Sequence, residues 1–439
     1  MNFVYTQLTS LAAPVYRFDS ISAPNGGVYL QYVTLATGSL IINNITTSAT
    51  GALILNMLTA TAGSISVTNS NIGTTLTLSS VLAQGTGGWI TVQDVSLQTL
   101  SWNTVRSPRM TVNRVSPPQG FSVETLEGNL TLTNCNFGQG ISLTSANFAN
   151  ANLILDNVTT EQSTSIGLYL SYTTFTNSQF NVTNSVIGVN TRAQSTYVIA
   201  LYMNHGSAVS TAAYFANNVI YARNRAPDVS GSNNAYAFLL SAPWRTGSSL
   251  TLFNNSIKGI VDSPALDYSP GYAVYINNFQ SDSYLSLPDN EWANTFGDLY
   301  LSVQRYPFDL AFNNFYRPDV GLVILSSSSD FGRNITITNS TFRKIDISAI
   351  TVANLTIQNV ALVRVLLLDG YTAYNSVLDN INVATKASVC ESHYCYIGGN
   401  ARATNITAYS TSALAVTFAY TQLTSLAAPI YRFDSISAP

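Results

Sequence analysis

The sequence predicts an all-β fold, a right-handed parallel β-helix (solenoid) with about 20–27 residues per coil. Short stretches of alternating apolar and polar residues, rich in β-branched side chains, indicate strands with one buried face. Many of these stretches end at Asn, which suits a turn because it tolerates left-handed backbone angles. The motif apolar–x–apolar–x–Asn occurs at 65–69, 130–134, 153–157, 180–184, 250–254, 335–339 and 355–359.

The spacing of the motif favours stacked coils. Its last position falls at residues 43, 69, 94, 114, 134, 157 and 184, in steps of 26, 25, 20, 20, 23 and 27 residues. In a parallel β-helix, equivalent strands of successive coils stack about 4.8 Å apart. The Asn side chains should then form a ladder in which each amide bonds the next and satisfies polar groups inside the turn. Right-handed winding follows from the preferred hand of parallel crossovers.

This pattern resembles the right-handed parallel β-helix (pectate-lyase-like) superfamily, which includes pectate-lyase-like enzymes, phage tailspikes and surface adhesins. The resemblance covers residues 28–190 well and 330–418 less fully. It rests on coil spacing and Asn position, so it implies a fold and not an activity. In character the chain is closest to the surface adhesins and fibre-forming members, because the signatures of the enzymes are absent.

We expect five segments along one continuous solenoid. Residues 1–24 and 420–439 are two copies of one segment, 25–190 and 331–419 are regular coils, and 191–330 are coils with long loop insertions. In the middle segment the steps lengthen to 34 and 36 residues. Insertions in a solenoid coil often lie on a binding face. The candidate binding residues in these loops are Trp244, Arg245, Tyr268 and Tyr272.

The two copies of the repeated segment are nearly identical. Residues 5–24 and 420–439 agree at 19 of 20 positions at an offset of 415 residues, and only Val15 and Ile430 differ. This exchange suggests two related copies under a packing constraint, with an artificial duplication as the alternative. We therefore expect one 415-residue period of a tandem array and the start of the next period. The residues expected at this seam are Tyr5, Leu8, Tyr16, Phe18, Tyr420, Leu423, Tyr431 and Phe433.

Composition narrows the class of protein. Charged residues make up 9% of the chain and hydrophobic residues 46%, with a net charge of −3. Such a chain has enough apolar surface to fold, and it lacks the basic footprint of a nucleic-acid-binding protein. It also lacks an apolar run long enough for a membrane-spanning helix. Surfaces with few charges and many Tyr and Thr residues are common outside cells, so we expect an extracellular or cell-surface location.

The sequence offers little for catalysis. A β-helix lyase or glycosidase needs paired carboxylates, or a basic residue beside an acidic metal site. Neither pattern is present, and the only histidines are His205 and His393. The cluster Cys390, His393 and Cys395 lacks the second ligand pair of a typical zinc site. We therefore expect no enzyme activity, no metal and no cofactor. Cys390 and Cys395 are candidates for a small disulfide that leaves Cys135 over, and three unpaired thiols are the alternative.

Nine N-glycosylation sequons occur, about as many as chance gives in a chain so rich in Asn, Ser and Thr. Two of them, Asn157 and Asn339, fall in the expected ladder, where a buried amide could not carry sugar. Glycosylation is compatible with an exported protein. The remaining candidate sites are Asn44, Asn129, Asn181, Asn254, Asn334, Asn354 and Asn405.

Two functions fit these features. The first is a structural subunit or tandem repeat of an extracellular filament, whose partners are copies of itself joined end to end by continuation of the β-helix. A period would then hold roughly 17 coils and extend on the order of 80 Å. The second is a glycan-binding adhesin or a tailspike-like binding module. A polysaccharide lyase or hydrolase is the third and least favoured function.

Overall fold

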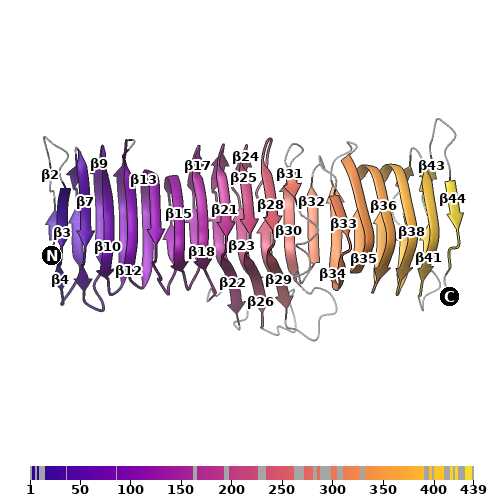
Figure 1. Ribbon diagram of the computed structural model, residues 1–439, viewed down its shortest axis with the longest axis horizontal. Coiled ribbons are helices and arrows are strands. Elements are labelled where there is room, and N and C mark those ends of the chain that lie inside the picture. Colours follow the sequence, from indigo (N-terminus) through magenta and orange to yellow (C-terminus); the bar gives the residue numbers. More distant parts are fainter. Residues whose placement is uncertain are drawn as a thin grey trace.

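The computed structural model of the chain is an elongated stack of coils with the two termini at opposite ends (Figure 1). Its described residues form strands, turns and bends and no helix. This architecture confirms the predicted all-β parallel solenoid. The structure describes residues 2–4, 7–8, 15–35, 37–85, 87–161, 166–191, 197–225, 234–261, 271–279, 284–286, 298–303, 310–326, 332–389, 395–397, 400–409, 416–418, 421–423 and 431–437.

The described strands belong to four parallel sheets, which we call A, B, C and D in the order in which a coil visits them. Sheet A contains β3 (Val15–Asp19), β7 (Gly38–Asn43), β10 (Gly63–Asn71), β12 (Trp89–Ser96), β13 (Thr99–Asn113), β15 (Leu126–Asn136), β18 (Asn152–Thr159), β21 (Gln179–Thr183), β25 (Ala212–Ala216), β28 (Ser249–Phe253), β31 (Tyr284–Ser286), β33 (Leu310–Asn313), β35 (Gly332–Ser348), β36 (Thr351–Leu362), β38 (Thr372–Val383), β41 (Ala401–Ala408) and β44 (Tyr431–Asp434).

Sheet C runs without a break from one end of the molecule to the other. It contains β1 (Asn2–Val4), β5 (Val28–Gln31), β9 (Leu53–Ala60), β11 (Thr75–Ala83), β13, β14 (Phe121–Val123), β16 (Ile141–Thr144), β19 (Ile166–Ser171), β23 (Tyr197–Asn204), β27 (Asn234–Leu240), β30 (Tyr272–Phe279), β32 (Asp298–Val303), β34 (Tyr316–Ser326), β35, β37 (Val365–Asp369), β39 (Lys386–Val389) and β42 (Val416–Phe418).

The other two sheets are built from short strands and from the ends of longer ones. Sheet B has the short strands β4 (Ser22–Ala23), β8 (Thr46–Thr47), β22 (Val186–Thr191), β26 (Val219–Asn224) and β29 (Ser256–Val261). Sheet D has β2 (Gln7–Leu8), β6 (Thr34–Leu35), β17 (Ala146–Ala149), β20 (Thr174–Thr176), β24 (Ser207–Val209), β40 (Cys395–Ile397) and β43 (Thr421–Leu423).

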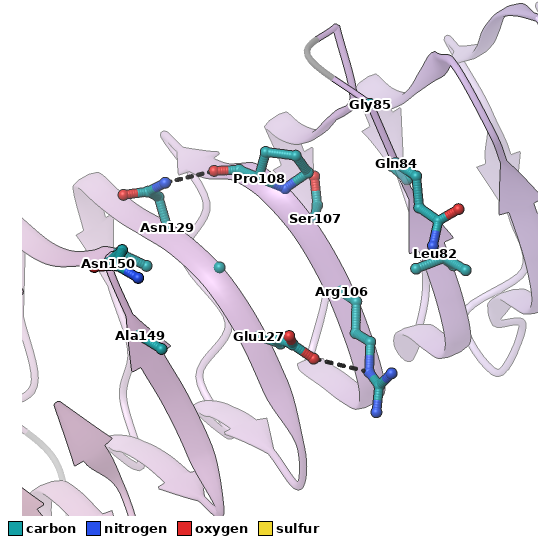
Figure 2. A pocket seen from close by; sticks show the side chains of 13 residues that line it. Leu82, Gln84, Gly85, Arg106, Ser107, Pro108, Glu127, Asn129, Ala149 and Asn150 are labelled. Atoms are coloured by element: carbon teal, nitrogen blue, oxygen red, sulfur yellow. Dashed lines mark hydrogen bonds and ion pairs between the residues drawn. The ribbon is translucent and has the colours of Figure 1, made fainter. Parts of the chain in front are cut away.

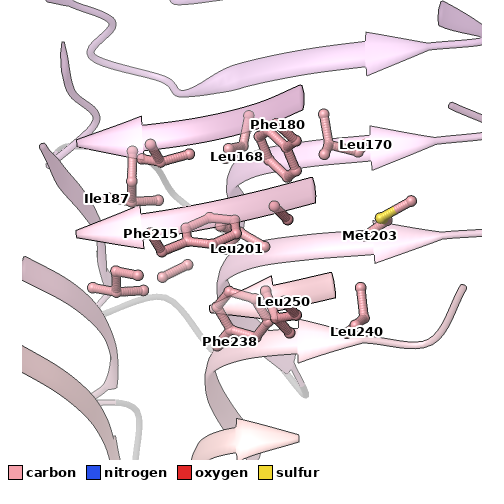
Figure 3. Close-up of a cluster of buried hydrophobic side chains, with 14 of the residues drawn as sticks. Leu168, Leu170, Phe180, Ile187, Leu201, Met203, Phe215, Phe238, Leu240 and Leu250 are labelled. Carbon is pink, nitrogen blue, oxygen red and sulfur yellow. The ribbon is translucent and has the colours of Figure 1, made fainter. Parts of the chain in front are cut away.

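The core forms because strand alternation sends every second side chain inside, where equivalent residues of successive coils stack. In sheet A, for example, Leu40, Ile65, Ile90, Met110 and Leu130 are paired in register and fully buried. In the middle of the molecule (Figure 3), Phe180 and Phe215 of sheet A and Phe238 of sheet C lie among leucines. Their rings are not equivalent positions of successive coils and meet edge to face, with centroids 5.1 Å and 5.2 Å apart.

The corner between sheets A and B explains the Asn motif. At this AB corner one residue of each described corner adopts a left-handed conformation with φ between 48° and 56°. Asn adopts these angles more readily than residues with branched or apolar side chains, which is why it occupies most of the corners that follow sheet A. The AB-corner residues are Ser20, Asn44, Asn69, Asp94, Arg114, Asn134, Asn157, Asn184, Asn217, Asn254, Asn314, Asn339, Asn359, Asn380, Asn405 and Ser435.

Two details of the predicted spacing need correction. Asn43 pairs with Thr68, so the corner residue of that coil is Asn44, one position later. In the middle segment the corner residue between Asn184 and Asn254 is Asn217, so the two long steps are 33 and 37 residues and not the expected 34 and 36. Part of the extra length of the middle coils lies in β22, β26 and β29, which project beyond the body of the stack (Figure 1).

Candidate functional site

The two copies of the repeated segment occupy equivalent places in the first and last coils. In sheet D, Leu8 of β2 pairs with Leu35, and Leu423 of β43 pairs with Ile397. The preceding strands of sheet C match too, with Phe3 in β1 and its counterpart Phe418 in β42. Both copies therefore follow the same path through the coil. Two of the predicted seam residues, Tyr5 and Tyr420, lie outside the described residues.

The match continues into sheet A and through the AB corner. Tyr16 and Phe18 lie in β3, and Tyr431 and Phe433 lie in β44 at the same positions of the strand. The corner residues that follow, Ser20 and Ser435, have φ of 54° and 50°.

The neighbours of the two copies are complementary. The first copy pairs with the following coil, because β3 pairs with β7 and β4 with β8. The second copy pairs with the preceding coil, because β43 pairs with β40 and β44 with β41. A coil inside the stack pairs with the coil before it and with the coil after it. The first copy makes only the second of these pairings, and the second copy makes only the first.

The single difference between the copies falls at a surface position. Val15 is 59% exposed at the start of β3. Packing within this chain therefore does not restrict Val15. Its counterpart Ile430 lies outside the described residues, so the packing constraint on the exchange stays a prediction.

The Asn ladder exists, but it lies on the outer surface of the AB corner. The Nδ2 of Asn157 donates to Oδ1 of Asn134 at 2.9 Å, and Asn254 donates in the same way to Asn217 at 2.9 Å. These corner side chains are exposed. The expectation that this ladder points into the turn was wrong. At the left-handed corner two successive side chains, such as those of Asp156 and Asn157, face outward before the next one, Val158, is buried.

A second, internal ladder uses the residue after the corner. Asn218 and Asn255 are each 2% exposed, and Nδ2 of Asn218 donates to Oδ1 of Asn255 at 2.9 Å. Nδ2 of Asn218 also donates to the carbonyl of Val182 at 2.8 Å, and its Oδ1 accepts from the backbone N–H of Ser185 at 2.9 Å. This pair satisfies buried backbone groups, which is the role that the sequence predicted for all the Asn residues of the ladder.

The fold itself explains most of the sequons. At the AB corner an Asn is followed by an inward residue and then by an outward Ser or Thr, which spells Asn–x–Ser/Thr. This arrangement holds at Asn44, Asn157, Asn254, Asn339 and Asn405, all of them exposed. Burial was therefore the wrong reason to exclude Asn157 and Asn339. The other four sequon residues, Asn129, Asn181, Asn334 and Asn354, are partly buried on strands of sheet A.

The predicted binding residues of the middle segment are not gathered in one place. Trp244 is 1% exposed and bridges to Ala208 in sheet D, so its ring belongs to the core. Arg245, the next residue, is exposed. Tyr268 lies outside the described residues.

Tyr272 belongs to an aromatic cluster on the outer face of sheet C. Its ring stacks on Tyr236 with centroids 5.0 Å apart, and Tyr275 stacks on Tyr300 at 4.3 Å. The two stacks meet edge to face, with Tyr272 and Tyr275 at 5.3 Å and 87°. Burial, together with the neighbouring Tyr300, raises the pKa of Tyr275 to about 12. Because the rings cover one another's faces, the cluster joins neighbouring coils and presents little open ring surface to a sugar.

A buried ion pair lies beside this cluster. Asp298 pairs in register with Tyr272, and its carboxylate accepts from Nη2 of Arg343 at 2.6 Å. The backbone N–H of Gly321 donates to the same carboxylate at 2.8 Å. An added Cβ at Gly321 would lie 2.6 Å from Asp298 Oδ1, so a larger residue here would have to displace the carboxylate from its position. Sequence patterns did not point to this pair, because its members are 45 residues apart.

The cysteines behave differently from one another. Cys395 is disulfide-bonded, and its expected partner Cys390 lies outside the described residues. Cys135 is a free, buried thiol that donates to the carbonyl of Thr133 at 3.1 Å. Burial raises its pKa to about 11. It occupies the position after the AB corner, where Ser185 and Ser340 make the same backbone contact.

The surface of the described chain includes the following two grooves. The first, of about 500 Å³, crosses the corner between sheets D and A (Figure 2). Its lining includes residues of the two 20-residue coils that end at Arg114 and Asn134, which are shorter than their neighbours. An exposed ion pair between Arg106 and Glu127 spans it at 3.2 Å, and Nδ2 of Asn129 donates to the carbonyl of Pro108 at 2.6 Å.

The second groove, of about 430 Å³, runs along the AB corner between Asn314 and Asn382. Within the described ranges no three His, Cys, Asp or Glu residues gather as a metal site would need. His205 stacks on Tyr172 with centroids 5.2 Å apart. No described helix is long and apolar enough to span a bilayer.

Comparisons with protein-family models, with curated proteins and with solved structures found no match to this chain. The coil geometry and the repeated segment are therefore the evidence on which a function can be argued.

Proposed function

We propose that the chain is a structural repeat of an extracellular filament, in which one parallel β-helix continues from period to period. The observation that supports this proposal is the equivalence of the two copies of the repeated segment. They share strand, sheet and corner positions, and their pairing partners are complementary. One copy of the segment could therefore pair with both sets of neighbours at once. It would join two periods without a change in the strand register of either.

The energetics favour such continuation. An open strand edge exposes unpaired N–H and C=O groups, and a coil stacked on it satisfies them. The stack also buries inward side chains such as Phe18, which packs against the core in the first coil. In a solenoid each coil contacts only its neighbours, so a repeating array has no upper limit of length.

The structure also sets the expected dimension of a period. Sixteen successive pairings connect β1 with β42 in sheet C, whose Phe3 and Phe418 are equivalent. At about 4.8 Å per coil a period should advance roughly 77 Å. The sixteen coils replace the seventeen expected from motif spacing.

The test is a two-period chain in which residues 25–439 follow residue 439. We expect electron microscopy to show one straight rod that is roughly 77 Å longer than the single-period protein. Hydrogen exchange should protect the strand amides of the internal copy as strongly as those of β10 or β36.

A matched control carries Gly–Ser residues in place of 420–439 at the junction. It should give two rods joined by a bend, with rapid exchange at the junction. If the unaltered two-period chain bends in the same way, or exchanges as fast at its internal copy, the proposal is wrong.

A further inference from the structure

The AB corner carries a groove with the chemistry of a binding site. It is about 430 Å³ in volume, within the range of small-ligand sites. None of the ten described residues that line it carries a charge. Two parallel rows of side chains form its walls, and buried Ser340 and Val360 lie between them.

One wall is the outer Asn ladder. Asn359 donates through Nδ2 to Oδ1 of Asn339 at 2.9 Å, and Asn380 donates to Asn359 at 2.9 Å. An amide nitrogen has two N–H groups and an amide oxygen has two lone pairs. Each rung therefore keeps a donor and an acceptor that the ladder does not use.

The ladder is open at one step. Asn314 and Asn339 are both described corner residues, yet no side-chain hydrogen bond joins them, although their coils are paired through the backbone. Both side chains are exposed. A hydroxyl group placed between them would accept from one amide and donate to the other.

The opposite wall combines an aromatic ring with a small residue. Tyr316, Thr341, Ala361 and Asn382 are paired in register along sheet B. Tyr316 is 65% exposed and lies beside the open step. Because the side chain of Ala361 is shorter than those of its neighbours Thr341 and Asn382, the wall is hollow at this position. Unlike the tyrosines of sheet C, Tyr316 has no ring partner among the described contacts, so its surface is open to a ligand.

We propose that this groove binds a neutral oligosaccharide that lies along the axis of the solenoid. Hydroxyl groups both donate and accept, as the unused amide groups do, and the exposed ring of Tyr316 suits the apolar face of a sugar. An anionic ligand finds no cation among the described residues that line the groove. The inference does not depend on the continuation of the helix from one period to the next.

The test uses the full chain, produced in a host without N-glycosylation so that Asn339 carries no sugar. Titration calorimetry would measure binding of neutral β-glucan, xylan, mannan and chitin oligosaccharides, with oligogalacturonate as the anionic probe. We expect at least one neutral probe to bind with a Kd of about 1 mM or tighter. Tyr316→Ala should weaken this binding about tenfold.

Two further variants separate a site from a general surface effect. Ala361→Gln should fill the hollow and abolish binding while leaving Tyr316 and the ladder in place. Tyr374→Ala removes a tyrosine of similar exposure, 59%, outside the groove and should change the Kd by less than about twofold. All three substitutions are at exposed positions, so circular dichroism should show an intact fold.

Three results would overturn the proposal. They are no neutral probe bound at about 1 mM, binding of the anionic probe alone, or equal affinity of Tyr316→Ala and the parent protein.

Discussion

Substitution of Asn359 tests whether the AB corner depends on left-handed backbone and on the outer ladder. Asn359 has φ of 54° and makes two ladder bonds, as donor to Asn339 and as acceptor from Asn380, each 2.9 Å long. We consider three replacements, Ala, Gly and Asp, because they remove these features in different combinations.

The structure gives the expected order of stability. Asn359→Ala loses both exposed bonds, worth together about 1 kcal/mol, and leaves a Cβ in a left-handed conformation that costs roughly 1–2 kcal/mol. Asn359→Gly also loses both bonds, but glycine adopts the left-handed conformation without strain. The greater conformational freedom of glycine in the unfolded chain costs about 0.5–1 kcal/mol of stability. Asn359→Asp keeps the acceptor for Asn380, so it should lose about 0.5 kcal/mol.

Native-state hydrogen exchange of the amides in β36 and β38 is the suitable assay, because coils of a solenoid open locally and not all at once. The free energy of local opening should fall in the order Asn, Asp, Gly, Ala at position 359. Thr356→Ala, on the outer face of the same strand, is the control and should change it by less than about 0.5 kcal/mol. A Gly variant that opens more easily than the Ala variant would refute the argument from backbone conformation.

Three more predictions follow from other sites. Because the pKa of Tyr275 is raised in the folded protein, the unfolded chain loses this proton first as the pH rises. The free energy of unfolding should therefore decline from pH 10 towards 12, by on the order of 1 kcal/mol once solvent screening of this half-buried group is taken into account. In urea titrations Tyr275→Phe should flatten this decline, and an unchanged slope would contradict the prediction. Gly321→Ala should break the Asp298 ion pair and cost about 3 kcal/mol in urea denaturation, whereas Gly26→Ala, with nothing within 4 Å of an added Cβ, should be almost neutral. Cys135→Ser should change stability by less than about 1 kcal/mol, and the native thiol should resist thiol reagents until the protein unfolds; rapid labelling would show that it is not buried.

Much of the fold could be predicted because its rules are local. Alternation in a stretch such as Ile65-Ser-Val-Thr fixes which side chains face inward, and the Asn that follows marks the left-handed corner. The exact residue at each corner was harder to predict. Asn43 and Asn44 are adjacent and chemically identical, and only pairing of Thr68 with Asn43 shows which of them turns the corner.

The candidate sites depended more heavily on contacts between coils. Trp244 was expected in a binding loop because it lies in an irregular segment, but the neighbouring coil buries it against Ala208. Tyr316 attracted no notice in the sequence. Its exposure and its place beside Asn314 and Asn339 arise only when residues 25 positions apart are stacked.

The sequence alone determined the 415-residue repetition, the parallel coils and the strand phase, because identity, alternation and turn chemistry are properties of neighbouring residues. The tertiary structure decided which amides face solvent, which aromatic rings are covered and where the surface is hollow. Those properties depend on the side chains that the next coil places about 4.8 Å away, and no local pattern records them.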